Sequence, residues 1–196
     1  LSLTEYFAKF ESSFLLPETD RSPVNGYLTR IANQSILNEL DRTRITRTIS
    51  FLGNQIENSL RGEIHSHGIF GSFSRRTNLP RSIDPNSDID YMILFLDNQY
   101  SPQTYLDRLK RFVNATYSRS EIKQSHPTIM LNLNHIKIEL VPAILTQGIL
   151  GQTFQIPAKF SGYDTWQSTD PLKFNEEVLH KNNFYGSLIK PLIRVL

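Results

Sequence analysis

Apolar residues recur at helical spacing in the first third of the chain. Residues 2–15 carry Leu3, Phe7, Phe10 and Phe14 three or four positions apart, which predicts an amphipathic helix. A polar break follows at residues 17–23, and helical spacing then resumes to about Leu60. The spacing does not decide whether this second stretch is one long helix or two helices broken near Asp41.

The middle of the chain changes to the two-residue period of β-strands. Pro142 is predicted to end the last of these strands, because proline has no backbone N–H to donate. The later segments are predicted as a strand at 63–70, a polar loop at 73–87, strands at 91–96, from 121, at 128–133 and at 135–141, a helix at 102–117, irregular chain at 146–170, and a helix from 175 to the last residue. Because helical spacing continues to the last residue, we expect the sequence to be a fragment.

Two aspartates stand at the head of the apolar strand at 91–96. Asp88 and Asp90 are two positions apart, so their side chains are expected on the same face of the strand. Two ionised carboxylates at that separation repel each other, and a divalent cation between them reverses the penalty. Aspartate pairs of this spacing also occur on exposed strand ends without any metal, so the pair needs support from other residues.

Two further features give that support. Gly71 and Ser72 form a predicted turn whose backbone N–H groups and hydroxyl can meet a phosphate. Glu139 lies in the middle of an apolar strand, on the face opposite Ile138. A carboxylate there needs a partner, since burying it alone costs several kcal/mol. Glu139 either completes a three-carboxylate cluster with Asp88 and Asp90, or it pairs with Lys137, or it faces water on an edge strand.

A phosphate-binding turn beside three carboxylates favours nucleotidyl transfer. Two metal ions about 3.5–4 Å apart would activate a hydroxyl and steady the leaving pyrophosphate. In this hypothesis Asp88 and Asp90 hold both ions, Glu139 orients the ion beside the hydroxyl, and Gly71 and Ser72 hold the triphosphate. Catalysis would then consist mainly of positioning and charge neutralisation.

Several stretches of the chain resemble the polymerase-β-type nucleotidyltransferase superfamily, and more closely the bacterial cyclic-oligonucleotide synthases (CD-NTases), relatives of cyclic GMP-AMP synthase and oligoadenylate synthase. The resemblance covers the chain from about Ile45 to the end. It is carried by Gly71-Ser72-Phe73, Arg76-Thr77, Ser87-Asp88-Ile89-Asp90, Ser120-Glu121-Ile122-Lys123-Gln124-Ser125, Glu139-Leu140-Val141-Pro142, Trp166-Gln167-Ser168-Thr169-Asp170-Pro171 and Leu188-Ile189-Lys190-Pro191-Leu192-Ile193-Arg194.

The resemblance implies an α+β fold, with a mixed sheet flanked by helices and the start of a helical second lobe. It implies N-terminal helices and a catalytic core over residues 1–160, and the beginning of the helical lobe over residues 161–196. It also implies Asp88, Asp90 and Glu139 as catalytic and metal-binding residues. Gly71, Ser72 and Lys190 are expected to bind nucleotide, although Lys190 also fits a surface lysine.

The activity implied by the resemblance is the joining of nucleoside triphosphates, such as ATP or GTP, into a cyclic di- or trinucleotide with two Mg²⁺ or Mn²⁺ ions. The implied role is a second messenger in antiphage, CBASS-like defence, needing no nucleic acid and leaving room for a regulatory protein partner. Two alternatives remain open from the residues. The nucleotide could go to a protein or an RNA 3′ end, or the chain could be an inactive nucleotide-binding fragment.

Composition limits the other function classes. The 196 residues contain no cysteine, which excludes disulfides, thiolate zinc sites and cysteine nucleophiles and is compatible with the cytoplasm, where we expect the protein. Net charge is +2, too small for a surface that coats nucleic acid. No apolar run of about 18 residues is present, so we expect no membrane span.

A few other residues have two interpretations. His65 and His67 alternate along a predicted strand and fit either a metal site or ordinary packing. The arginines of the loop at 73–87 could approach the triphosphate or simply face solvent. Trp166 is expected to anchor the two lobes rather than to stack on a base.

Overall fold

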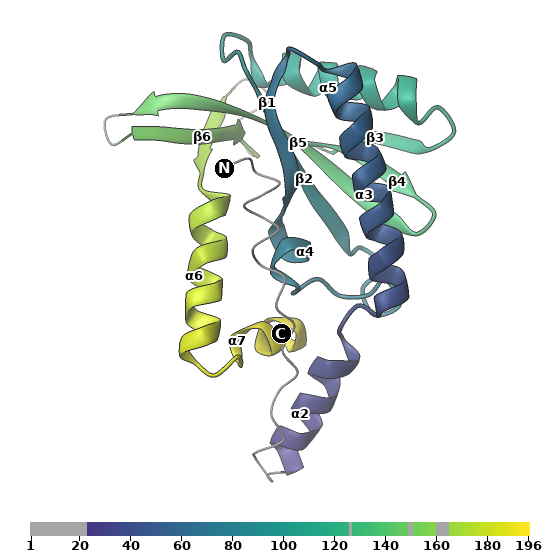
Figure 1. Cartoon of the computed structure of the whole chain (residues 1–196), viewed down its shortest axis with the longest axis vertical. Helices are drawn as coiled ribbons and strands as arrows, with labels where there is room; N and C mark the ends of the chain where they lie inside the picture. The colour runs from purple at the N-terminus through teal and green to yellow at the C-terminus, as the bar shows by residue number, and fades with distance from the viewer. Residues whose placement is uncertain (1–22, 126, 149–150, 160–164) are drawn as a thin grey trace.

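The protein, described by a computed structural model over residues 23–125, 127–148, 151–159 and 165–196, is built around a mixed β-sheet (Figure 1). Its elements confirm the predicted α+β class, while the helix predicted at residues 2–15 lies outside the described residues. In chain order they are α2 (Pro23–Gln34), α3 (Glu39–Ser59), β1 (Ile64–Phe70), α4 (Gly71–Arg75), β2 (Asp88–Phe95), α5 (Pro102–Thr116), β3 (Glu121–Ser125), β4 (Thr128–Leu133), β5 (Ile136–Gly148), β6 (Gly151–Pro157), β7 (Trp166–Thr169), α6 (Pro171–Phe184) and α7 (Ile189–Val195).

Seven strands form the sheet in the described part. Five of them lie in the order β1-β2-β5-β4-β3, and β6 pairs with the far end of β5 and with β7. The β2 and β5 strands run parallel, and every other pair is antiparallel. Helix α5 and the β3–β4 hairpin lie between β2 and β5 in sequence, because parallel neighbours need a crossover. The crossover leaves β2 and β5 side by side in the middle of the sheet.

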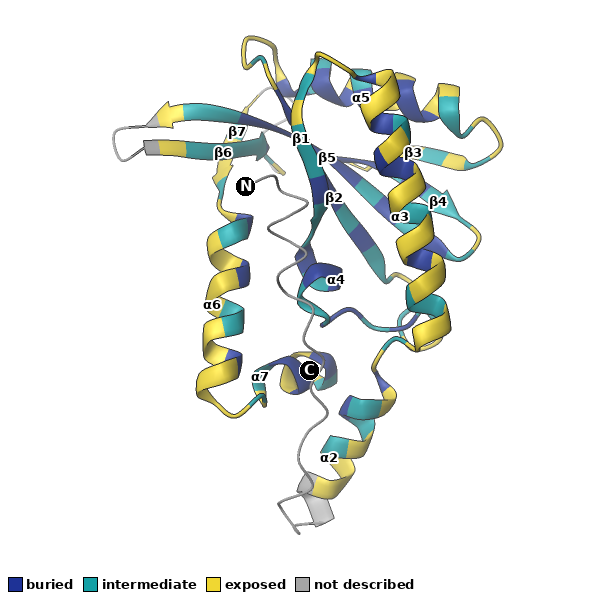
Figure 2. Ribbon diagram, viewed as in Figure 1, coloured by how far each residue is buried: buried dark blue, intermediate teal, exposed yellow. Residues whose placement is uncertain are grey.

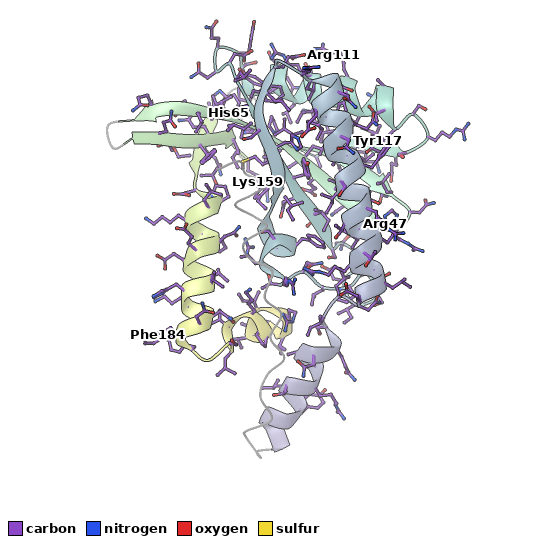
Figure 3. All side chains as sticks on the ribbon, in the orientation of Figure 1. Arg47, His65, Arg111, Tyr117, Lys159 and Phe184 are labelled. Carbon is purple, nitrogen blue, oxygen red and sulfur yellow. The ribbon has the colours of Figure 1, made fainter. Side chains whose placement is uncertain are left out.

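The large hydrophobic core lies between one face of the sheet and helices α3 and α5 (Figure 2). Helix α3 contributes Ile45, Leu52 and Ile56 at helical spacing, while its other side is exposed. Arg47, for example, lies on the outer surface of α3 (Figure 3). The strands contribute every second residue, including Ile89, Tyr91, Ile93, Ile129, Leu131, Ile138 and Leu140.

The opposite face of the sheet carries a smaller apolar cluster. Met92, Leu94 and Ala143 pack there against residues of β1, β6 and α6. Helix α4 contacts β1 and β2 on this side and also contacts α6. Among the described residues, no helix is long and apolar enough to cross a membrane.

The first helical region is two helices. Residues 35–38 separate α2 from α3, and the side chain of Asn38 accepts a hydrogen bond of 2.8 Å from the backbone N–H of Asp41. This N-cap places the break just before Asp41. The loop predicted at 73–87 is wrong at its start, because α4 continues to Arg75 and ends at Arg76 in the left-handed conformation, φ 58°.

The prediction that Pro142 ends its strand is wrong, since β5 runs on to Gly148. On one side, β5 pairs with β4 as far as Leu140 and with β6 from Ile144. Pro142 falls in the gap between these two ladders, where a missing N–H costs no bond on that side. The prediction of irregular chain at 146–170 is also wrong, because the extension of β5 pairs with β6, and β6 pairs with β7.

The last helical region differs from the predicted single helix. Helix α6 begins at Pro171, four residues before Asn175, because Asp170 caps it by accepting a hydrogen bond of 2.9 Å from the backbone N–H of Lys173. The helix ends before Gly186 and Ser187, which have φ angles of 61° and 67°. These left-handed residues turn the chain, and α7 then packs against α2.

Candidate active site

The structure brings Asp88, Asp90 and Glu139 onto one face of two neighbouring strands. Asp90 on β2 stands in register with Glu139 on β5, and Asp88 stands in register with Lys137. Residues in register on adjacent strands project to the same side, so all four charged side chains share the face opposite the large core. The cluster therefore joins acids that are about fifty positions apart in the sequence.

Burial and the charges of neighbouring acids disfavour the ionised forms of Asp90 and Glu139. Burial first, and then the charges of Asp88 and Glu139, raise the pKa of Asp90 to about 6, against the opposing effect of Arg75 and Lys137. Burial also raises the pKa of Glu139, and Asp88 is its next cause. Acids whose pKa is raised by burial and by neighbouring charges are typical of functional sites.

Gly71 is required by its contact with Asp90. A Cβ atom at Gly71 would lie 1.8 Å from Oδ2 of Asp90, and its φ of 69° also favours glycine. The sequence predicted this glycine for a phosphate-binding turn, and the structure adds a second reason, because the backbone of α4 lies directly against the Asp90 carboxylate. The position of the first turn of α4 is therefore tied to the position of the Asp90 carboxylate.

The donor set fits a hard divalent cation, because it consists of three carboxylates on one face and their repulsion would be relieved by positive charge. In the described part of the chain, however, no three His, Asp or Glu side chains converge as a ready metal site. Instead, the Lys137 ammonium lies 3.3 Å from Oδ2 of Asp88 and 3.7 Å from Oε1 of Glu139. Thr128 donates to Oε2 of Glu139 at 3.3 Å. The first two interpretations of Glu139 therefore hold in part, since it lies beside Asp90 and also pairs with Lys137.

Ser72 and Arg75 present polar groups beside the acids. The carbonyl of Ser72 accepts a hydrogen bond of 2.9 Å from the backbone N–H of Thr77, while its hydroxyl has no partner among the described residues. Arg75 donates to Oδ1 of Asn175 at 3.0 Å and lies over the ring of Phe174. Burial lowers the pKa of Arg75, and Asp90 opposes that shift. Arg75 is held by α6 and does not face solvent freely.

Lys190 is buried, with 9% of its surface exposed, so it is not the surface lysine that the sequence also allowed. Burial lowers its pKa, and the positive charges of Arg76 and Arg194 add to the effect. Arg194 donates to the carbonyls of Ala32 at 3.2 Å and Arg76 at 3.0 Å. Helix α7 therefore holds cationic groups next to the end of α4, where an anion would be stabilised.

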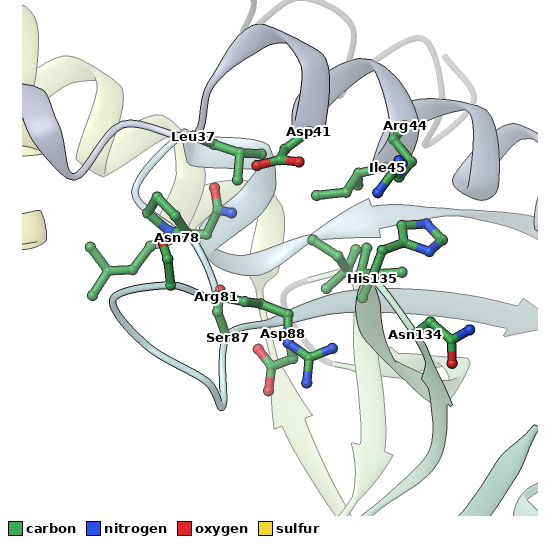
Figure 4. Close-up of a pocket in the computed structure, with 15 residues that line it drawn as sticks. Leu37, Asp41, Arg44, Ile45, Asn78, Arg81, Ser87, Asp88, Asn134 and His135 are labelled. Carbon is green, nitrogen blue, oxygen red and sulfur yellow. The ribbon is translucent and has the colours of Figure 1, made fainter.

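A cavity of about 330 Å³ lies at the start of β2, between α3 and the loop that precedes the strand (Figure 4). Arg44, Arg81 and His135 supply polar groups to its lining, and Asp88 is the acid of the cluster that reaches it. Asp90, Glu139 and Gly71 are absent from this lining. The cavity therefore borders the acid cluster and does not contain it.

Other sequence candidates have structural roles. The Nδ1 atom of His67 is 2.6 Å from the hydroxyl of Tyr91, and its Nε2 atom is 3.4 Å from Glu57, so both ring nitrogens have partners. This favours packing over a metal site with His65. Trp166 packs edge-on against Tyr105, at 5.6 Å between ring centroids, at the margin of the large core.

Sequence reasoning missed Thr128 and Asn175 as neighbours of the site. Asn175 donates to the hydroxyl of Ser74 at 3.3 Å, across 101 sequence positions. A local pattern carries no signal for such a contact. Thr128 reaches Glu139 diagonally across the β4–β5 hairpin, two positions before Met130, which is the residue in register with Glu139.

Solved structures show the same fold at low sequence identity. The Bradyrhizobium diazoefficiens CD-NTase CdnG in complex with GTP has a TM-score of 0.70 and 16% identity over 84% of this chain and 48% of its own. CdnE cyclic dinucleotide synthase from Elizabethkingia meningoseptica, with GTP and Apcpp, has a TM-score of 0.61 and 16% identity over 76% and 56%. CdnC of E. coli MS115-1 with ATP has a TM-score of 0.65 and 15% identity over 86% and 55%.

The chain spans about half the length of these structural neighbours. No curated protein matches its sequence. The similarity confirms the polymerase-β-like fold predicted from the motifs.

A family model, the Second Messenger Oligonucleotide or Dinucleotide Synthetase domain, matches residues 23–182. That match covers most of the sequence and includes all three acids. The chain therefore belongs to the Second Messenger Oligonucleotide or Dinucleotide Synthetase (SMODS) family.

Proposed function

We propose that this chain is the catalytic core of a nucleotidyltransferase that joins nucleoside triphosphates into a cyclic di- or trinucleotide. Family membership supports the reaction class. The observation that carries the assignment to residues is the register of Asp90 with Glu139, together with the close packing of Gly71 on Asp90. These contacts fix a carboxylate cluster beside the first turn of α4.

In the proposed reaction, a ribose hydroxyl of one nucleotide attacks the α-phosphorus of another. A phosphodiester bond forms, the bond to the β-phosphate breaks, and pyrophosphate leaves. Glu139 accepts the proton of the hydroxyl. Bound divalent cations, Mg²⁺ or Mn²⁺, would supply positive charge to the hydroxyl and the triphosphate. Asp88, Asp90 and Glu139 would hold these ions.

The triphosphate lies against α4 in this proposal. The hydroxyl of Ser72 and the backbone of the first turn donate to phosphate oxygens. Lys190 on α7 lies near Arg76 and Arg194, and in this proposal it pairs with the negative charge of the triphosphate. Arg75 lies close enough to affect Asp90 and is a further candidate for contact with phosphate.

The test is product formation by the full-length protein with labelled triphosphates and Mg²⁺ or Mn²⁺. We expect a small product that resists phosphatase, and we expect Asp88→Asn with Asp90→Asn to abolish it. Label on proteins or RNA, without a small cyclic product, would instead support transfer to a macromolecule. Thermal stabilisation by nucleotide without turnover would indicate a binding module. Undiminished product in the double variant would end the assignment of the acids.

The role in antiphage defence, with Mg²⁺ as the working ion in the cytoplasm, is part of the same proposal. Its support is the family, whose description is second-messenger synthesis. Cells carrying the full-length gene should resist phage more than cells carrying the double variant. Equal plaque counts in both would contradict a defence role while leaving the chemistry intact.

A further inference from the structure

Lys137 is the cation placed between two of the acids. It stands in register with Asp88 on the neighbouring strand and is two positions before Glu139, so it reaches both. Its ammonium nitrogen lies 3.3 Å from Asp88 and 3.7 Å from Glu139. The Lys137 side chain is 17% exposed, against 31% for Asp88 and 21% for Glu139. The contact is therefore more sheltered than an ordinary surface ion pair.

Lys137 lies among three acids and makes direct contact with two of them. Asp88, Asp90 and Glu139 share one sheet face with Lys137, and Arg75 acts on Asp90 from α4. Without a bound metal ion, the three carboxylates have Lys137 as the cation in direct contact with two of them. A four-carbon stem lets the ammonium move aside when another cation arrives.

We propose that Lys137 is a positioning residue that acts as a built-in counter-ion, holding Asp88 and Glu139 in the nucleotide-free protein and opposing the binding of a free divalent cation there. This inference rests on the proposed function, because it takes the acids as the metal site. A nucleoside triphosphate brings its own negative charge. The opposition from Lys137 is then largely offset, so the cation binds tightly only together with the nucleotide.

The size of the effect follows from Coulomb's law. An ammonium about 6 Å from a divalent cation, in surroundings close to water, weakens cation binding by about tenfold. Screening by salt reduces this figure less at a sheltered site than at an exposed one. Replacing Lys137 by methionine removes the charge and keeps an unbranched side chain of similar length.

The experiment measures Mn²⁺ affinity by electron paramagnetic resonance, first without nucleotide and then with a non-hydrolysable ATP analogue. We expect Lys137→Met to bind Mn²⁺ about tenfold more tightly than the wild type without nucleotide. With the analogue present, the difference should fall below about threefold. Lys110→Met is the matched control, because it removes the same charge from the exposed side of α5, and it should leave both affinities unchanged.

Two more variants keep the test decisive. Lys137→Arg retains the charge and should bind Mn²⁺ like the wild type, so it covers the case in which the methionine variant fails to fold. Asp90→Asn should lose Mn²⁺ binding and shows whether the ion sits at the acids. If Asp90→Asn loses the ion while Lys137→Met binds it no more tightly than the wild type, the inference about Lys137 is overturned and the metal site stands. Mn²⁺ binding unaffected by Asp90→Asn would overturn the site itself.

Discussion

The two faces of the central sheet have opposite characters, although the same strands make both. On β2, Ile89 and Ile93 face helices α3 and α5 and are at most 2% exposed. Asp88 and Asp90 face the other way, beside Glu139 and α4. The first face stabilises the fold by burying apolar surface, and the second stores repulsion between acids. A strand with a period of two can therefore carry a core and a reactive site at adjacent positions.

The largest expected effect is on the apolar face. Ile138 is fully buried between β2, β4 and the helices, and it is the direct neighbour of Glu139 in sequence. Ile138→Ala should lower the free energy of unfolding by about 2–5 kcal/mol, because it removes buried methyl groups and leaves a cavity. Urea denaturation measures this. A loss similar to that of an exposed residue, below about 0.5 kcal/mol, would contradict the packing of this face.

Substitution of Gly71 should break the link between α4 and the acids. Gly71→Ala places a methyl group where Oδ2 of Asp90 lies, and it also strains the left-handed backbone. Gly62 is a matched control, since its φ is 81° and nothing lies within 4 Å of an added Cβ. Gly62→Ala should lose about 1–2 kcal/mol of stability from backbone strain, and Gly71→Ala should lose more, because its methyl group also displaces the Asp90 carboxylate. Gly71→Ala alone should lose Mn²⁺ binding and product formation, and equal behaviour of the two would contradict the contact.

The acid face should become more stable when a charge is removed. Asp90 has its pKa raised to about 6, so in the folded protein its ionised form is disfavoured. Its contribution to stability is fully present below the pKa of the unfolded chain and is lost as pH rises through about 6. In metal-free buffer, Asp90→Asn should therefore gain about 1–3 kcal/mol over the wild type above pH 7, and less near pH 4.

Melting temperatures across pH 4 to 8, with a chelator present, measure this difference. A gap between Asp90→Asn and the wild type that stays constant with pH would contradict the electrostatic explanation. In chelator-free buffer with a non-hydrolysable ATP analogue present, addition of Mn²⁺ should then raise the melting temperature of the wild type and leave that of Asp90→Asn unchanged.

The smallest expected effect concerns the helix that covers α4. Asn175 accepts from Arg75 and donates to the hydroxyl of Ser74, so Asn175→Ala removes both contacts. The expected loss is about 1–2 kcal/mol, because Ser74 is buried and is left with fewer partners. Glu177→Ala, on the exposed side of α6, is the control and should change stability little. Equal melting temperatures of the two variants would contradict docking of α6 through Asn175.

The apolar face was largely predictable from the sequence, and the acid face only in part. Alternation around Ile138 and Ile89 was enough to assign strands and their buried side, and the spacing of Asp88 and Asp90 placed them together. The continuation of β5 past Pro142 was not predictable, because it depends on which strand pairs beside the proline. The contacts of Asn175 and Arg194 join elements more than a hundred residues apart, and no local pattern encodes them.

For the site residues, the sequence indicated which residues lie near one another but not which atoms make contact. The sequence placed Gly71 near the acids but gave no sign that the Asp90 carboxylate occupies the space of a side chain at position 71. It offered Lys137 as a partner for Glu139, and the structure shows the same ammonium reaching Asp88 as well. Such contacts depend on strand register, which the sequence constrains through the buried face alone.

The most direct measurement is the anomalous diffraction of Mn²⁺ in crystals grown with a non-hydrolysable ATP analogue. Ions bound among Asp88, Asp90 and Glu139, with the triphosphate against Gly71 and Ser72, are the predicted result. Glu139 turned away from the aspartates, or Mn²⁺ bound elsewhere on the molecule, would contradict the account.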